Sequence, residues 1–413
     1  MTNHLTPKSG ASYWLRLLWP FLLCFGITAP GLYFQLTHAA ISPVVGMLAF
    51  GGAVVAGAFV LGWISEAAEL DLRGGLSIAL LAVIAILPEY VVDFYFAFAA
   101  GKDPSMAQYA SANLTGANRL LLGLGWPAMA LFGFLALRSF AKKKNEPAPK
   151  FGVVLESEAR VDLAFLVVAS LIALIVPLTH QFDIVTGIVL VTLFVLYLIR
   201  ISSQDKEEPE LEGIPALVGA LPKWGRRGFL LVTALLAAFV IIVVAEPFAH
   251  SLVEAGKALH ISEFVLVQWL APLASEAPEF IVAIMFAARG KPAIGLAILL
   301  SSKVNQWTAL AGSLPIGYAL GGGHGALPMD AVQIEEFTLT IAQTVFGAAI
   351  LLSLRLGRLD AIALFGLFAI TLVFPDPSIR IWVAYLYFAI AIPLVVYRFR
   401  EFGRTLQAPF LKG

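Results

Sequence analysis

The sequence is poor in cysteine and in charged side chains, and each shortage excludes a class of protein. Its 413 residues include one cysteine, Cys24, so no disulfide can form within the chain. Only 13% of the residues are charged, whereas an ordinary soluble domain has about 25%. This composition excludes a disordered chain, a fibrous protein and a typical cytosolic enzyme. Lysine plus arginine equals aspartate plus glutamate at 27 each, so the charge gives no sign of a nucleic-acid partner.

What the chain has in abundance is apolar sequence, because 60% of its residues are hydrophobic. A membrane-spanning helix needs about 20 mostly apolar residues, and by this measure the sequence predicts an all-α polytopic membrane protein with about 12 spans. The run at 105–138 is too long for one straight span, and we expect it to bend near Gly123–Pro127. The predicted spans are 13–36, 42–64, 75–100, 105–138, 161–179, 183–201, 227–249, 262–288, 292–320, 333–355, 358–375 and 379–398.

Lysine and arginine are distributed unevenly among the segments that join these spans. With the N-terminus placed in the cytoplasm, cytoplasmic segments hold 22 basic residues and external loops hold three, Lys102, Lys257 and Arg380. Basic residues accumulate on the cytoplasmic side of membrane proteins. We therefore expect an integral multi-pass protein of the plasma (inner) membrane, with both termini in the cytoplasm.

Two segments of the chain resemble each other. The dipeptide Pro-Glu occurs at 88–89 and at 278–279, and Phe-Ala follows each copy after the same interval, at 96–97 and at 286–287. Further along, Asn118 pairs with Asn305. The first segment is expected to enter the membrane from the inside and the second from the outside, so the two copies are inverted. Inverted repeats with interrupted helices near the midplane are typical of secondary transporters.

The repeat predicts how the chain is divided. Two inverted halves of five spans each are joined by a short polar linker, and one extra helix lies at each end. The predicted parts are an N-terminal extra helix at 1–41, a first repeat at 42–201, a cytoplasmic linker at 202–226, a second repeat at 227–375, and a C-terminal extra helix with its tail at 376–413.

Four carboxylates lie within predicted spans, where a charge is costly and by default marks function. Glu89 and Asp93 are four residues apart, and Glu276 and Glu279 are three apart, so each pair shares one face of a helix. The two pairs could meet at the pseudo-symmetry axis. Four carboxylates around a midplane cavity would bind hard cations through oxygen, and protons would compete for the same oxygens.

Prolines and neutral side chains could add further oxygen ligands. Pro88 and Pro278 cannot donate to the carbonyls four residues earlier, and those carbonyls could face a cation where the helix breaks. The helices that follow carry amide and hydroxyl oxygens. These candidates are Asn113, Thr115 and Asn118 in the first half, and Ser301, Ser302 and Asn305 in the second.

These motifs resemble those of the cation/calcium exchanger superfamily, which includes the sodium/calcium exchangers. That family carries two inverted repeats with the pattern Gly-Ser/Thr-Ser-x-Pro-Glu, each followed by a helix with Gly-Ser-Asn. The segment 274–279 is similar to the first motif, with Ser275 at the hydroxyl position, whereas Ala85 and Ile86 replace the hydroxyl residues before Pro88-Glu89. The second motif is similar to 116–118 and, more loosely, to 303–305.

The resemblance implies a fold of two inverted halves over about 42–375, with Glu89 and Glu279 as the central cation ligands. Members of the family exchange sodium, calcium, potassium or protons by alternating access without ATP. The resemblance therefore implies a transporter and no enzyme, with no cofactor beyond the transported cations Ca²⁺, Na⁺ or H⁺. The expected partners are inorganic cations and the lipid bilayer, with no nucleic acid, and the oligomeric state stays open.

The sequence also departs from the family pattern. Asp93 and Glu276 add acids, and Lys303 and Arg119 add positive charges near the site. The four acids and two bases leave a formal charge of minus two, enough for one divalent or two monovalent cations. Lys303 could pair with an acid or stand in for a bound cation, and it can line the site together with Asn305 only if their helix is distorted. Arg119 could instead point to a neighbouring helix.

Several readings follow from these residues. The first is an antiporter exchanging Ca²⁺ for Na⁺ or H⁺, and the second is a Na⁺ or K⁺/H⁺ antiporter on the same fold. A passive cation channel would not need two interrupted helices with buried acids. A lipid-phosphate enzyme would need a nucleophile or base beside Arg119 and Lys303, and the sequence offers none there. Asp330, Glu335 and Glu336 are expected at a solvated helix start at the outer mouth.

Overall fold

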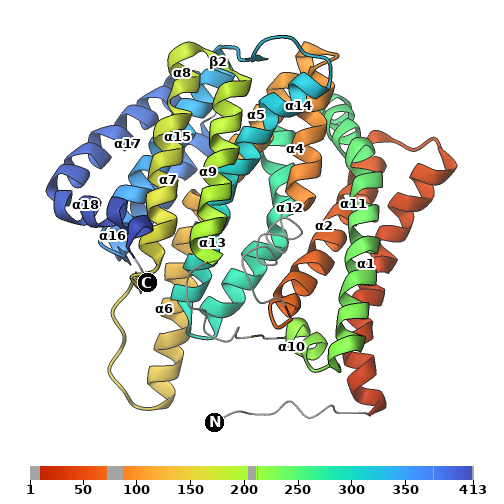
Figure 1. The fold of residues 1–413 in the computed structure, drawn as a ribbon, viewed down its shortest axis with the longest axis horizontal. Helices are drawn as coiled ribbons and strands as arrows, with labels where there is room; N and C mark the ends of the chain where they lie inside the picture. The colour runs from red at the N-terminus through yellow and green to blue at the C-terminus, as the bar shows by residue number, and fades with distance from the viewer. Residues whose placement is uncertain (1–9, 72–86, 203–210, 212, 375, 412–413) are drawn as a thin grey trace. The chain divides into compact units, whose positions relative to one another are not determined.

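The computed structural model describes residues 10–71, 87–202, 211, 213–374 and 376–411, and helices dominate these ranges (Figure 1). The chain divides into two compact units. Unit 1 comprises residues 1–95 and 198–278, and unit 2 comprises 96–197 and 279–413. The divisions fall inside α4 (Leu87–Ala100) and α12 (Glu263–Ala288), which are the helices that carry the two Pro-Glu dipeptides.

Nine helical stretches of the described residues are long and apolar enough to cross a membrane. Each predicted apolar run overlaps a described helix, except that the run 75–100 lies partly outside the described residues. The count of 12 spans stays a prediction. The nine stretches are α1 (Ala11–Thr37), α2 (Pro43–Ala68), Pro104–Lys143, Ala159–Thr179, α9 (Ile184–Ser202), α11 (Lys223–Leu259), α12, α15 (Ala331–Leu351) and α17 (Pro377–Tyr397). Shorter helices are α10 (Ile214–Gly219), α16 (Arg358–Val373) and α18 (Phe399–Gln407).

Unit 1 is built around α1, α2 and α11, which run alongside one another (Figure 1). Leu17 and Phe21 of α1 pack in one apolar cluster with Leu61 of α2 and Ile241 of α11. A side-chain carbon at Gly57 would lie 2.7 Å from Ile241, so glycine is what permits this close approach of α2 and α11.

A charged contact fixes the end of α2 to the start of α11. Arg226 donates to one carboxylate oxygen of Asp71 at 2.6 Å, and Arg227 donates to the other at 3.2 Å. Arg226 also donates to the carbonyl of Gly219, at the end of α10, at 2.7 Å. The hydrogen bond and charge of Arg226 hold the pKa of Asp71 below its ordinary value.

This contact predicts how the stability of the protein depends on pH. Because the folded-state pKa of Asp71 is lowered, its contribution is present above the ordinary pKa of about 3.9 and is lost as pH falls through the folded-state pKa. Asp71→Asn should destabilise the protein by about 1.5–3 kcal/mol at neutral pH. The difference from wild type should shrink at more acid pH in thermal unfolding of the detergent-solubilised protein. Glu156→Gln, at an exposed position, is the control and should leave the curve unchanged.

Unit 2 contains two long helical stretches that are each interrupted by one π-helical segment. In the first, α5 (Ala107–Leu120) passes through η2 (Leu121–Gly125) into α6 (Trp126–Lys143). The whole stretch would measure about 60 Å, roughly twice the hydrocarbon thickness of a bilayer. The π segment lies where the sequence predicts a bend, and π turns and glycine residues are common causes of helix kinks.

The second stretch has the same construction. It runs from α13 (Pro292–Asn305) through the π-helical η3 (Gln306–Leu310) into α14 (Ala311–Leu320). Each π segment begins shortly after an asparagine of the predicted site, Asn118 or Asn305. Single π-helical turns are rare and occur frequently at functional sites.

Four two-residue strands tie the helix ends of unit 2 together. Strand β1 (Val153–Val154) pairs with β4 (Arg355–Leu356), and β2 (Gln181–Phe182) pairs with β3 (Leu327–Pro328), both antiparallel. Adding one and the same number to the residue numbers of β1 and β2 gives the residue numbers of β3 and β4. The residues that pair in the first two-stranded sheet correspond by this shift to residues that pair in the second. The connections on either side of α7 (Ala159–Ala173) and α15 are therefore built alike.

Candidate functional site

The predicted site residues are divided between the two units. Glu89, Asp93, Ser275 and Glu276 belong to unit 1, and the others belong to unit 2. Nearly all of them are buried, which is uncommon for polar and charged side chains. The buried ones are Glu89, Asp93, Asn113, Asn118, Ser275, Glu276, Lys303 and Asn305, and the half-buried ones are Glu279, Ser301 and Ser302.

The second Pro-Glu helix, α12, differs from its prediction. The expected break is wrong for α12, which continues as one helix through Pro272 and Pro278 to Ala288. Pro278 still lacks an N–H, so the helix offers the carbonyl of Ala274 no donor at that position. The Ser275 hydroxyl donates back to the carbonyl of Ala271 at 3.2 Å, which leaves its oxygen lone pairs as acceptors.

In unit 2, the oxygens of Asn118 hold a positive charge supplied by the protein. The Lys303 ammonium donates to the Asn118 side-chain oxygen at 2.7 Å and to its backbone carbonyl at 2.9 Å. The Asn118 amide nitrogen donates to the carbonyl of Leu114 at 2.8 Å, and this bond turns the side-chain oxygen toward Lys303. Asn118 thus binds an ammonium of the protein in this structure, and its role as a ligand of a transported cation stays a prediction.

An aromatic ring also contacts the Lys303 ammonium. Its ammonium lies 5.5 Å from the centre of the Trp307 ring, within the range of a cation–π interaction. Trp307 belongs to the π segment that begins directly after Asn305. Lys303 and Asn305 themselves lie in the regular α-helix α13, and the π segment begins only after them, so a site shared by these two residues stays a prediction.

Arg119 points to a neighbouring helix, which was one of its two predicted alternatives. It forms a buried ion pair with Glu336 of α15 and donates to the hydroxyl of Thr371 at 2.7 Å. Arg380 of α17 pairs with the other Glu336 oxygen at 2.8 Å. Two arginines therefore share one carboxylate among α5, α15 and α17.

This cluster corrects two expectations. Glu336 is fully buried, whereas the sequence placed it at a solvated helix start, and Arg380 is buried within α17, whereas it was expected in an external loop. Both residues already lay just inside their predicted spans, at 333–355 and 379–398. What the sequence could not show is that Glu336 pairs with Arg119 and Arg380, which allows these charges to be buried.

A second acid of unit 2, half-buried, escaped the sequence analysis. Asp162 of α7 accepts a hydrogen bond from the Tyr197 hydroxyl of α9, and that hydroxyl lies 2.8 Å from the Ser301 hydroxyl of α13. Ser301 thereby connects a predicted ligand helix to this acid. The sequence feature that could have identified Asp162 is its position, because Asp162 and Glu336 each lie near the start of an apolar run.

The two acid clusters occupy equivalent places in unit 2 but differ in charge. The shift along the sequence that relates the strands also relates Asp162 to Glu336 and Tyr197 to Thr371. Glu336 meets two arginines, whereas the hydrogen-bonding partner of the Asp162 side chain within the described residues is a neutral hydroxyl. The backbone arrangement is therefore repeated in the two clusters, whereas the charged partners of the acid are not.

The Glu336 cluster gives a stability prediction. Glu336→Gln leaves two buried arginines facing an uncharged amide, so the protein should lose about 3–5 kcal/mol of stability. Glu335→Gln makes the same chemical change one residue earlier, outside any ion pair of the described residues, and should cost about 1 kcal/mol or less. Thermal unfolding in detergent compares the two variants. Equal midpoints would contradict the assigned role of Glu336.

Comparisons with known proteins agree with this description. The family model for the sodium/calcium exchanger protein matches residues 41–202 and 229–375. A crystal structure of the H⁺/Ca²⁺ exchanger CAX is 36% identical, with a TM-score of 0.87, over 95% of this chain and 97% of that one. The structure of native YfkE is 16% identical, with a TM-score of 0.58, over 90% of this chain and 99% of that one. No curated protein sequence matches.

Proposed function

The chain belongs to the sodium/calcium exchanger family, and from this premise we propose that it exchanges Ca²⁺ for H⁺ across a membrane. Cation/calcium antiport by an integral multi-pass protein follows from the family. The observation that favours H⁺ as the counter-ion is the 36% identity with the H⁺/Ca²⁺ exchanger CAX over nearly the whole of both chains.

The proposed cation site combines the four acids with neutral oxygens. Glu89, Asp93, Glu276 and Glu279 would supply charge, and the hydroxyls and amides would complete the oxygen shell that Ca²⁺ prefers. Carboxylates crowded in a buried place also gain from binding protons. The same oxygens can therefore take Ca²⁺ and H⁺ in turn, and mutually exclusive occupancy is what couples the two fluxes.

We further propose that the site lies at the midplane between two inverted five-helix repeats, in a protein of about 12 spans. The strand pairing, which one shift along the sequence leaves unchanged, supports the repeat, as do the two π segments that follow the paired asparagines. The ranges matched by the family model, 41–202 and 229–375, support the repeat boundaries of 42–201 and 227–375. We propose that the protein lies in the plasma membrane with both termini in the cytoplasm.

The ammonium of Lys303 would add a positive charge of the protein itself to this site. In the described structure its ammonium occupies the oxygens of Asn118. A transported cation that takes those oxygens must first displace the ammonium, and the ammonium can return when the cation leaves. Lys303 would in this way prevent a bare, strongly negative cage in the unloaded state, which is the most costly state of such a site in a membrane.

The acids provide the first functional test. Glu89→Gln and Glu279→Gln each remove one charged ligand, so Ca²⁺ uptake into proteoliposomes under a proton gradient should fall about 100-fold, since each loss costs on the order of 3 kcal/mol. Glu254→Gln, on a partly exposed face of α11, should transport normally. Undiminished uptake in both site variants would remove the proposed cage.

A second candidate function is Na⁺ or K⁺/H⁺ antiport on the same fold. The observation that favours it is the fixed positive charge of Lys303, which lowers the net negative charge available to a divalent ion. The same proteoliposomes distinguish the two functions. Proton flux driven by Na⁺ or K⁺, without Ca²⁺ uptake under a proton or a sodium gradient, would establish the second function and exclude the first.

Lys303→Met tests whether the Lys303 ammonium competes with the transported cation. This change keeps the approximate length of the side chain and removes its charge. Ca²⁺ should bind about tenfold more tightly, because one positive charge no longer opposes it at the site. Lys223→Met, at the exposed start of α11, should leave the affinity unchanged. Isothermal titration of the purified protein measures both, and an unaltered affinity in Lys303→Met would separate Lys303 from the cation site.

A further inference from the structure

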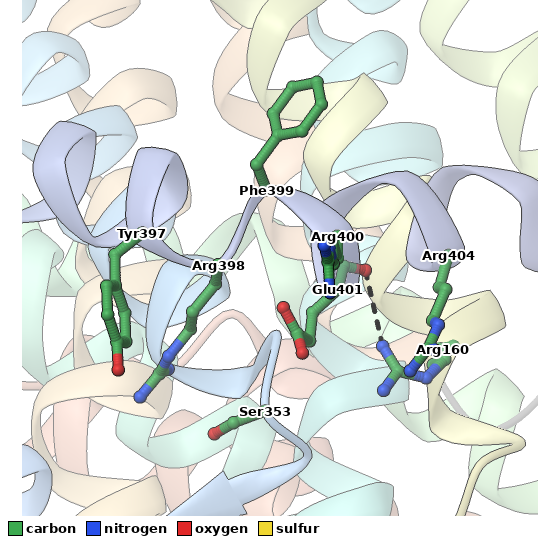
Figure 2. Close-up of a pocket in the computed structure, with 8 residues that line it drawn as sticks. All are labelled: Arg160, Ser353, Tyr397, Arg398, Phe399, Arg400, Glu401 and Arg404. Carbon is green, nitrogen blue, oxygen red and sulfur yellow. Dashed lines mark hydrogen bonds between the residues drawn. The ribbon is translucent and has the colours of Figure 1, made fainter.

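A basic cavity of about 720 Å³ lies at the C-terminal end of unit 2, and none of the predicted site residues lines it (Figure 2). Four arginines line it, and one acid accompanies them, so the formal charge of its charged residues is plus three. The arginines are Arg160 of α7, Arg398 at the end of α17, and Arg400 and Arg404 of α18, and the acid is Glu401.

Two of these arginines are fixed by backbone carbonyls near the C-terminal end of α15. Arg398 donates to the carbonyls of Ala349 at 3.0 Å and Ile350 at 2.6 Å. Arg160 donates to the carbonyl of Leu352 at 3.2 Å and to the Thr405 hydroxyl at 2.9 Å. A guanidinium carries five N–H donors, and these bonds use only some of them. Both groups are thus held in place with donors left to offer.

The other two arginines have no such anchor. Within the part of the chain that the structure describes, neither Arg400 nor Arg404 forms an ion pair or a side-chain hydrogen bond. The charge of Arg404 acts on Arg160, and both side chains line the cavity in Figure 2 although they come from different helices. Like charges brought together repel each other, and an anion between them would turn this repulsion into attraction.

The arginines match the chemistry of a phosphate group. The planar fork of a guanidinium binds two phosphate oxygens at once, and arginine is favoured wherever such recognition occurs. The excess of basic residues in cytoplasmic segments explains how many arginines lie at this end of the protein. It does not explain why four of them, from three helices, line one cavity.

The surroundings of the cavity indicate that the phosphate belongs to a lipid. The cavity directly follows α17, which is a candidate membrane span. Large aromatic side chains border it and are mostly exposed, with Tyr397 at 86% and Phe399 at 70%. In Figure 2, Phe399 points away from the arginines, so one short segment presents an apolar face and a basic face. Aromatic residues gather where a membrane meets water, and basic pockets at that depth bind acidic headgroups.

We propose that this cavity binds the phosphate headgroup of an anionic phospholipid. Arg400 and Arg404 bind the phosphate, while Arg160 and Arg398 add fixed donors and connect the occupied cavity to the end of α15. The site is independent of the proposed ion exchange, because neither its residues nor its ligand belongs to the cation site.

The test is a lipid titration of the purified protein in detergent, followed by native mass spectrometry. Phosphatidylglycerol should bind more tightly than phosphatidylcholine with the same acyl chains. The double variant Arg400→Ala/Arg404→Ala should weaken phosphatidylglycerol binding about tenfold or more. The control Lys144→Ala/Arg358→Ala removes two charges outside the cavity and should change the affinity by less than about twofold.

Three results would overturn the proposal. The cavity variant could bind phosphatidylglycerol as tightly as wild type, or wild type could bind both lipids equally. Inorganic phosphate could also bind in place of the lipid and displace it fully at millimolar concentration, which would assign the cavity to a soluble anion. A second variant, Arg400→Gln/Arg404→Gln, keeps polar side chains at both positions, and its thermal midpoint shows that lost binding does not arise from unfolding.

Discussion

The constraint on which this structure depends is the cost of placing a charged group in a span of a membrane protein. Such a group must find a partner of opposite charge, a set of hydrogen bonds or a transported ion. Glu336 finds two arginines, Lys303 finds the two oxygens of Asn118, and Asp162 finds the hydroxyl of Tyr197. With 13% charged residues in the whole chain, each buried charge is an exception that a specific contact must explain.

Helices could be predicted from the sequence because hydrophobic runs report directly on burial in lipid or protein. The predicted run 379–398 corresponds to α17 (Pro377–Tyr397), and 333–355 corresponds to α15 (Ala331–Leu351). The errors lie at the ends, where an aspartate cap starts the helix earlier than hydropathy indicates. Glu336 and Arg380 were expected in solvent because the ion pairs that bury them join residues far apart in the sequence. The break expected at Pro278 failed because the rest of α12 stays helical on both sides of it.

The sequence identifies candidate site residues by their type, but it does not predict the contacts that these residues make. Spacing along one helix predicts which side chains share a face, but Arg119 meets Glu336 across 217 positions of sequence, and Lys303 meets Asn118 across 185. Nothing local distinguishes an arginine that will neutralise an acid from one that will face an ion. The Asp162 cluster was missed for the same reason, because neither Tyr197 nor Ser301 is unusual in its own segment. The structure, and not the sequence, shows that Lys303 contacts Asn118 and that Arg119 contacts Glu336.

The unequal charges of the two equivalent clusters bear on how unit 2 can move. Separating a buried ion pair costs about 3–5 kcal/mol, whereas losing one hydrogen bond to a carboxylate costs about 1.5–3 kcal/mol. Separating α5, α15 and α17 at Glu336 therefore needs more free energy than separating α7, α9 and α13 at Tyr197. Helix α13 also carries Lys303 and Asn305. Within unit 2, α13 is therefore held at Ser301 by the weaker of the two contacts.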